Sequence, residues 1–168
     1  MRSRLISGWT CGAGGGRLRD VSTSDKDGLT LLGRSESRLP GSPDDARLET
    51  FENCRPGRRY WIRLEAPEFS SLCPVTGQPD SARLEIRYVP GERCVETKSL
   101  KFYLASFRNL PAFNEEIVNR ILDDLVEVLD PAELVVRGKF SPRGGIRLTC
   151  EARHPDTAEG GEAGENGR

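Results

Sequence analysis

A cysteine and an aspartate stand seven residues apart in the segment Cys73-Pro74-Val75-Thr76-Gly77-Gln78-Pro79-Asp80. A thiolate is a strong nucleophile when its surroundings set its protonation, and a carboxyl group can supply or accept the proton that each step moves. A buried structural cysteine, followed by an aspartate that caps the next element, explains the same two residues without chemistry, and free cysteines are commonly buried. Cys73 and Asp80 are therefore a candidate nucleophile and proton donor whose role depends on the rest of the chain.

Two lysines form a second candidate group. Lys98 and Lys101 lie three residues apart at the start of a predicted helix, so they share one helix face. Two ammonium groups beside the backbone N–H groups of a helix start suit a phosphate, whereas on an isolated helix a solvated basic edge is the commoner arrangement. No Gly-x-Gly-x-x-Gly motif follows a predicted strand, which argues against a Rossmann-type dinucleotide site.

Length and composition bound the class of protein. The 168 residues suit one domain with tails, and the net charge of −1 gives no general argument for nucleic acid or an acidic membrane as a partner. No apolar run is long enough to span a bilayer. The five widely spaced cysteines suit a reducing cytosol and argue against both a disulfide framework and a structural zinc site, and the single histidine, His154, argues against a zinc enzyme with imidazole ligands. We therefore expect no metal.

Hydrophobic periodicity predicts an α+β domain. Residues 1–46 are rich in Gly, Ser, Asp and turn signals and are expected to be a mobile leader, residues 47–154 a single folded domain, and the Gly/Glu-rich residues 155–168 a disordered tail. Apolar residues with a helical spacing predict two consecutive helices, the second of which stops at Asp130-Pro131. Alternating or short apolar runs predict strands on either side of this helix pair, at 59–65, 82–88, 134–136 and 146–150.

The prolines and the glycine of residues 67–80 predict a shaped loop between the first two strands, since they oppose a helix or a central strand. The order is then ββααββ. With mostly short connections, it predicts an antiparallel four-stranded sheet with both helices on one face.

Three separated motifs resemble one family. The segment Glu96-Thr97-Lys98-Ser99-Leu100-Lys101-Phe102-Tyr103 is similar to the signature of the NADPH-dependent 7-cyano-7-deazaguanine reductases of queuosine biosynthesis. Residues 69–80 resemble their catalytic loop and residues 138–146 their C-terminal hairpin, while residues 48–53 resemble the start of their core. The resemblance spans about residues 29–154. It implies the tunnelling fold, in which subunits join their sheets into a ring-shaped barrel with active sites between subunits, commonly as pentamers or decamers.

The resemblance also implies a reaction. By similarity, Cys73 adds to the nitrile carbon of the substrate to give a covalent thioimide, and Asp80 supplies the proton to nitrogen. Two hydrides from NADPH then give the 7-aminomethyl product. The expected setting is a cytoplasmic homo-oligomer that acts on a small molecule, with no direct contact to nucleic acid or membrane.

The family pattern assigns further residues. Lys98 and Lys101, with Arg143 as a weaker candidate, would contact the cofactor. The purine base would be held by the Glu115 carboxylate, with Val95, Glu96 and Thr97 lining the pocket. Glu115 alone is equally explained as a favourable charge at a helix N-terminus.

The chain departs from the family pattern immediately before Glu115, where the usual histidine is replaced by Asn114. An amide can hydrogen-bond the substrate but does not titrate near neutrality, so a proton relay at this position is put in doubt. Two alternatives stay open: a related transferase that forms an amidine from the same thioimide without NADPH, and a non-catalytic purine-binding assembly.

Overall fold

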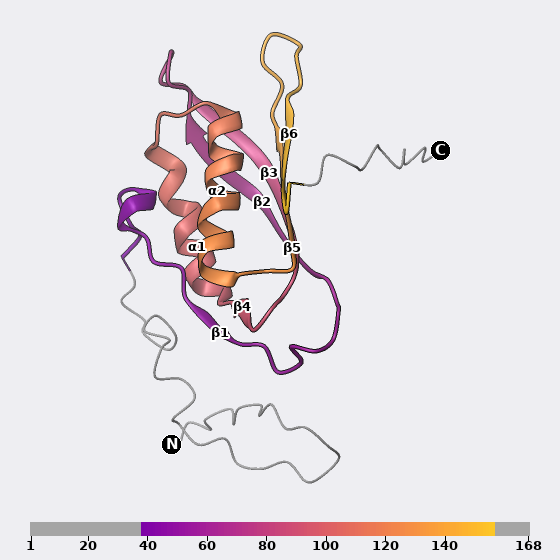
Figure 1. Ribbon diagram of the computed structural model, residues 1–168. Coiled ribbons are helices and arrows are strands. Elements are labelled where there is room, and N and C mark those ends of the chain that lie inside the picture. Colours follow the sequence, from indigo (N-terminus) through magenta and orange to yellow (C-terminus); the bar gives the residue numbers. More distant parts are fainter. Residues whose placement is uncertain (1–37, 157–168) are drawn as a thin grey trace, which may run out of the picture.

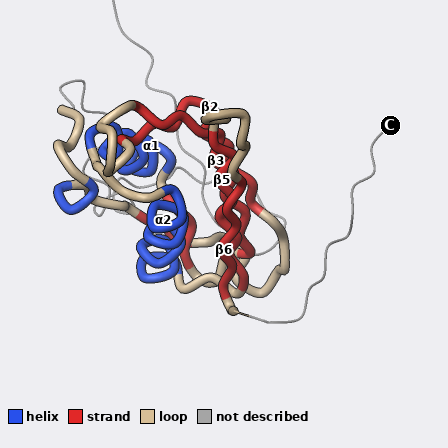
Figure 2. The backbone as a smooth tube through the Cα atoms, turned by 90° about the horizontal axis from the view of Figure 1, so that it is seen from above, coloured by secondary structure: helices blue, strands red, loops and turns tan. Residues whose placement is uncertain are grey.

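The computed structural model describes residues 38–156, which form an α+β domain (Figure 1). Its main sheet is antiparallel, with four strands in the spatial order β2 (Ile62–Leu72), β3 (Pro79–Val89), β5 (Glu133–Phe140) and β6 (Thr149–His154). Helices α1 (Thr97–Ser106) and α2 (Asn114–Leu129) lie between β3 and β5 in the sequence and cover one face of this sheet (Figure 2). The predicted ββααββ order and the placement of the helices are confirmed.

A small second sheet was not predicted. Strand β1 (Thr50–Glu52) pairs antiparallel with β4 (Arg93–Val95), which follows directly after β3. Two short 3₁₀ helices complete the described elements, η2 (Pro43–Asp45) and η3 (Phe107–Asn109), the latter joining α1 to the loop before α2. Strands of three residues carry too little periodicity to be recognised in a sequence.

The core lies between the helices and the main sheet. On β3 the alternate residues Leu84, Ile86 and Tyr88 are at most 2% exposed and point toward the helices. On α2 the buried residues recur with the helical spacing that the sequence shows, from Ile117 through Leu125 to Leu129. The helix ends where expected, because Asp130 adopts a left-handed conformation (φ 45°) and Pro131 follows it.

The prediction of a loop over residues 67–80 is wrong at both ends. Strand β2 continues through Pro67 to Leu72, and β3 begins at Pro79, so only residues 73–78 form the loop. Pro67 is tolerated because β2 is an edge strand and because the β2–β3 register shifts between Ala66 and Phe69, which marks a bulge. The loop that carries Cys73 is therefore held closely by two long, paired strands.

The last strand also lies later than predicted. Residues 146–150 were expected to form it, whereas β6 spans Thr149–His154. Between β5 and β6 the chain makes a projecting hairpin (Figure 1), in which Arg143 and Ile146 exchange both backbone hydrogen bonds at 2.9 Å. Gly144 and Gly145 both have positive φ (55° and 82°), as the two central residues of a type I′ turn require. Glycine adopts positive φ readily because it has no Cβ.

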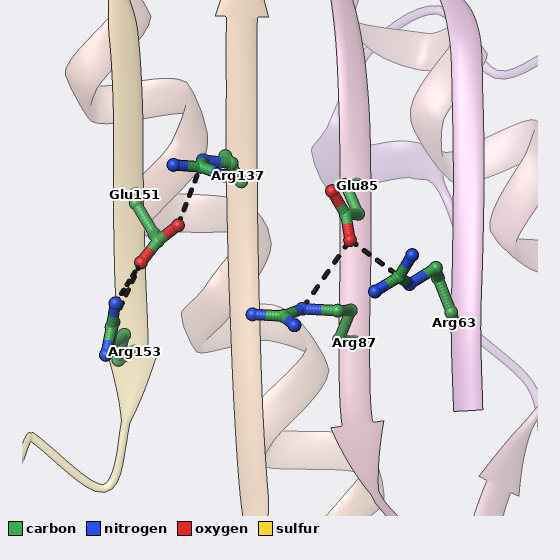
Figure 3. Close-up of polar contacts among 6 residues, drawn as sticks. All are labelled: Arg63, Glu85, Arg87, Arg137, Glu151 and Arg153. Atoms are coloured by element: carbon green, nitrogen blue, oxygen red, sulfur yellow. Dashed lines mark hydrogen bonds and ion pairs between the residues drawn. The ribbon is translucent and has the colours of Figure 1, made fainter. Parts of the chain in front are cut away.

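The face of the main sheet that points away from the helices is lined by charged side chains (Figure 3). Glu85 pairs with Arg63 at 3.2 Å and with Arg87 at 3.5 Å. Glu151 pairs with Arg137 at 3.0 Å and with Arg153 at 2.5 Å. We refer to these six residues as the charged face. In the part of the chain that the structure describes, no helix packs on it (Figure 2).

Most of the leader and nearly all of the tail lie outside residues 38–156, so the expectations about them are not addressed. The last part of the leader is described, and it contacts the helices: Arg108 donates to the carbonyl oxygen of Pro40 at 2.9 Å, and Arg120 pairs with Asp44. Cys54 is disulfide-bonded, whereas Cys73, Cys94 and Cys150 are free. Among the described residues, no helix is long and apolar enough to cross a membrane.

Candidate active site

The loop between β2 and β3 is closed by its own backbone. The N–H of Cys73 donates to the carbonyl oxygen of Gln78, and the N–H of Gly77 donates to that of Cys73, both at 2.9 Å. Gly77 has φ 67°, a conformation that residues with a Cβ rarely adopt. Cys73 itself is partly exposed, as a nucleophile must be.

This loop stabilises the thiolate form of Cys73. The pKa of the thiol is lowered below its ordinary value, first by a hydrogen bond from the Thr76 side chain and then by the backbone N–H groups of Thr76 and Val75. The positive charge of Arg143 acts in the same direction, and the slight desolvation opposes it. Sequence reasoning missed Thr76, although a hydroxyl three residues after the cysteine in a tight loop was the available signal.

Asp80, the predicted proton donor, is at the start of β3 and is 7% exposed. Its Oδ1 lies 2.6 Å from Nε of Arg143, which extends from the β5–β6 hairpin. The same guanidinium donates through Nη2 to the carbonyl oxygen of Pro79 at 2.8 Å. The structure places the guanidinium of Arg143 directly on the candidate acid, and its contact with the cofactor stays a prediction.

The start of α2 lies at the same end of the sheet. Leu72 donates its N–H to the carbonyl oxygen of Leu110 at 3.0 Å, and its own carbonyl accepts from the N–H of Ala112 at 3.2 Å. These two bonds form a single parallel β-bridge between Leu72 and Pro111. The bridge brings the first turn of α2, with Asn114 and Glu115, beside the end of β2.

Two buried oxygen atoms at this end have no hydrogen-bond partner within residues 38–156, Oδ1 of Asn114 and Oγ of Ser71. Ser71 stands directly opposite Asp80 in the β2–β3 register. A buried acceptor without a partner is costly, so Asn114 is suited to a polar ligand. Glu115 is exposed, and its charge adds to burial in raising the pKa of the Cys150 thiol.

The remaining predicted site residues lie around the start of α1. Glu96 is buried and caps this helix, since its two carboxylate oxygens accept the backbone N–H groups of Lys98 at 2.8 Å and Ser99 at 2.7 Å. Val95 is buried and Thr97 is exposed. Both predicted cofactor lysines are on the helix: Lys98 lies over the Phe102 ring at 5.9 Å, and Lys101 is exposed.

The residues around Cys73 and the residues at the start of α1 lie at opposite ends of the domain. The N–H of Val95 donates to the Tyr88 hydroxyl, and Tyr88 stands opposite Ile62, at the first residue of β2. Cys73 directly follows Leu72, which bonds to Leu110 just beyond η3. The helical residues 97–109 therefore separate the two groups by roughly 20 Å. In Figure 1 the β2–β3 loop is at the top and the start of α1 is near β4 at the bottom. We call them the cysteine end and the lysine end.

A largely apolar groove between β2 and α1 is lined by parts of both elements, including Phe69, Leu100 and Leu104. Of the predicted ligand-binding residues, Thr97 and Lys101 line it and Cys73 and Asp80 do not. Within the described residues, no group of His, Cys, Asp and Glu side chains is arranged to hold a metal ion.

Comparison with known proteins agrees with this architecture. The family of QueF-like proteins matches residues 79–159. The crystal structure of an archaeosine synthase QueF-Like in the apo form superposes with a TM-score of 0.52 over 55% of this chain and 91% of that chain, at 22% sequence identity. The fold of this chain is the tunnelling fold.

Curated relatives are much closer in sequence. A reductase from Anaeromyxobacter sp. (strain K) is 54% identical over 113 residues, which are 67% of this chain and 93% of that protein. One from Bacteroides fragilis is 50% identical over 127 residues (75% and 83%), and one from Neisseria meningitidis is 46% identical over 127 residues (76% and 81%). All three are named NADPH-dependent 7-cyano-7-deazaguanine reductase, and this chain belongs to that family.

Proposed function

We propose that this chain is an NADPH-dependent reductase of the nitrile of 7-cyano-7-deazaguanine, and that Cys73 forms a covalent thioimide with the substrate. The relatives of this chain carry the name of that activity. The structural observation that supports the role of Cys73 is its loop, which stabilises a thiolate and is followed directly by the buried Asp80 with its partner Arg143.

The proposed first step is an addition. The sulfur of Cys73 bonds to the nitrile carbon, one of the C–N π bonds breaks, and the nitrogen takes up the proton that the thiol gives up, through Asp80. No electrons are gained or lost in this step. When bound, NADPH would supply the two hydrides that convert the thioimide to the primary amine. Over this reduction the sulfur of Cys73 leaves the carbon and takes one proton, and the nitrogen takes another.

The residues at the lysine end suit the cofactor's phosphates. Lys98 and Lys101 place two cations three residues apart near the start of α1, on one face of the helix. We propose that they bind NADPH, and that the base of the substrate is held by Glu115, Asn114 and the segment of Val95, Glu96 and Thr97. Retention of both lysines disfavours the amidine-forming transferase, which needs no NADPH.

We further propose that one active site is built by two copies of the chain. Roughly 20 Å of helix, residues 97–109, separates the start of α1 from the cysteine end, so one purine base cannot contact both within one chain. Strands β2 and β6 are the edges of the main sheet, and edges of this kind can pair between copies into a ring. Three large apolar side chains at the cysteine end are also exposed: Val75, Phe113 and Ile146.

The proposed assembly is a homo-oligomeric barrel, a pentamer or a decamer. We also propose a cytoplasmic location, which suits an enzyme that depends on a reduced thiol. The proposed catalytic unit is residues 47–154, with the leader and the tail outside it.

The activity is tested in two measurements on the full chain. Intact-mass spectrometry with 7-cyano-7-deazaguanine and no NADPH should show a gain of one substrate mass, which Cys73→Ala should abolish. Loss of nicotinamide absorbance should then require substrate, NADPH and Cys73 together. Bound substrate without any mass gain would refute the covalent mechanism, and an adduct without any NADPH oxidation would favour the transferase.

The two-copy site is tested by mixing inactive variants. Cys73→Ala lacks the nucleophile, and Lys98→Ala/Lys101→Ala should lose NADPH binding but still form the adduct. If each site takes its cysteine end from one copy and its lysine end from another, co-refolding the two variants in equal amounts restores about one quarter of the sites. No recovery in a mixture that is shown to co-assemble would mean that each site lies within one chain.

A further inference from the structure

We propose that Arg143 is a positioning residue for the first, cofactor-independent step, holding Asp80 in place at the cysteine end. This goes beyond cofactor binding, the role that family resemblance assigns to Arg143, and it rests on the proposed thioimide chemistry. Three contacts carry it: Nε of Arg143 lies 2.6 Å from Oδ1 of Asp80, and Nη2 lies 2.8 Å from the carbonyl oxygen of Pro79 and 3.4 Å from that of Gln78.

The hairpin fixes the position of Arg143. Arg143 is the first residue of the type I′ turn, and both of its backbone hydrogen bonds go to Ile146. At the base of the hairpin, the N–H of Ser141 donates to the carbonyl oxygen of Ser81 at 2.8 Å, next to Asp80. The guanidinium therefore extends from a braced turn, and its planar fork can contact a carboxylate and a carbonyl oxygen together.

The pair is not an ordinary surface ion pair. The side chain of Asp80 is 9% exposed and that of Arg143 is 40% exposed, so the carboxylate is largely removed from water while the cation is half-covered. Arg143 also acts on the nucleophile: the pKa of Cys73 is lowered first by the Thr76 side chain and the backbone N–H groups of Thr76 and Val75, and to the smallest extent by the charge of Arg143. One cation from the hairpin thus connects the candidate acid on β3 with the candidate nucleophile in the preceding loop.

The test compares Arg143→Gln, Arg143→Lys and, as a matched control, Arg147→Gln, which removes the same charge from an exposed residue of the same hairpin. The first readout is the rate of iodoacetamide alkylation of Cys73 against pH, assigned by peptide mass spectrometry, and it needs neither substrate nor cofactor. The second is the rate of adduct formation with 7-cyano-7-deazaguanine in the absence of NADPH.

We expect Arg143→Gln to move the Cys73 alkylation midpoint slightly to higher pH and to slow alkylation at pH 7 by up to about twofold, since the screened charge that is lost is the smallest cause of the lowered pKa. Adduct formation should slow by at least about tenfold, because Asp80 is also released. Arg143→Lys keeps the charge and should restore the midpoint, but a single ammonium group cannot reproduce the fork, so adduct formation stays slower than in the wild type. Arg147→Gln should change neither readout.

Two outcomes would overturn this role. In the first, Arg143→Gln forms the adduct at the wild-type rate and loses only NADPH affinity, which would make Arg143 a cofactor ligand alone. In the second, Arg147→Gln lowers both readouts as much as Arg143→Gln does. If the wild type itself forms no adduct, the proposed function fails instead. An unchanged alkylation midpoint in Arg143→Gln would in addition refute the electrostatic effect of Arg143 on Cys73.

Discussion

Replacing Glu96 should destabilise the protein more than any other glutamate substitution on its helices, because this side chain is both a predicted pocket residue and the cap of α1. In Glu96→Ala, two backbone N–H groups lose a carboxylate acceptor. The N–H of Lys98 is on a half-exposed residue and can bind water. Ser99 is fully buried, so its N–H is left without a partner.

The expected cost follows from this difference. A buried donor without a partner costs about 1–3 kcal/mol, and loss of a capping side chain costs about 0.5–2 kcal/mol, partly for the same bonds. We therefore expect Glu96→Ala to lower the free energy of unfolding by about 2–3 kcal/mol. Glu96→Gln keeps one acceptor oxygen and loses the charge, for which we expect about 1 kcal/mol.

The assay is urea unfolding at one fixed protein concentration, since any association also contributes to stability. Glu127→Ala is the control, because Glu127 is exposed on α2 and its loss removes the same charge. We expect that control to change stability by less than about 0.5 kcal/mol. Equal losses in Glu96→Ala and Glu127→Ala would show that the two hydrogen bonds of Glu96 do not stabilise α1.

Three further predictions concern single positions. Thr76→Val should raise the pKa of Cys73, so that thiolate reactivity, which is lost as pH falls through that pKa, is lost at a higher pH. Thr76→Ser keeps the hydroxyl and should not change this pKa. Identical alkylation profiles in the wild type and both variants would contradict the hydrogen bond from Thr76 to Cys73. Gly138→Ala should cost about 1–3 kcal/mol in unfolding experiments, because its Cβ would lie 2.8 Å from the Phe140 ring, whereas Gly57→Ala, with nothing within 4 Å, is the neutral control. Asn114→His should add a titration near pH 6.5 to the rate profile that the wild type lacks, and identical profiles would place residue 114 away from the substrate.

The helices and the longer strands were predictable because their apolar residues recur with a clear helical or strand period. The alternation of Leu84, Ile86 and Tyr88 identified β3, and the apolar stripe of α2 together with Asp130-Pro131 identified that helix and its end. Pro67 misled the prediction of β2, because a proline is compatible with an edge strand that contains a bulge, and neither an edge nor a bulge is visible in one sequence.

The candidate site was predictable in its residues but not in its arrangement. Cys73 and Asp80 stand out by type and spacing, and family motifs point to the lysines of α1. What brings Asn114 to the cysteine end is the pair of backbone hydrogen bonds at Leu72, between segments about forty residues apart, which no local pattern encodes. The position of Arg143 on Asp80 likewise depends on how β5 returns beside β3.

The charged face restricts how copies of this chain can meet. Stacking two such faces would remove several arginines and glutamates from water, and each ion that is desolvated without a new partner costs several kcal/mol. The four pairs drawn in Figure 3 already satisfy each other within one chain, so they offer little to a second face. Contacts that run along the strand edges leave this face hydrated. A ring closed through those edges would therefore enclose a water-filled channel lined by charged side chains. Added salt should then change the electrostatic potential inside the channel far more than it changes the affinity between subunits.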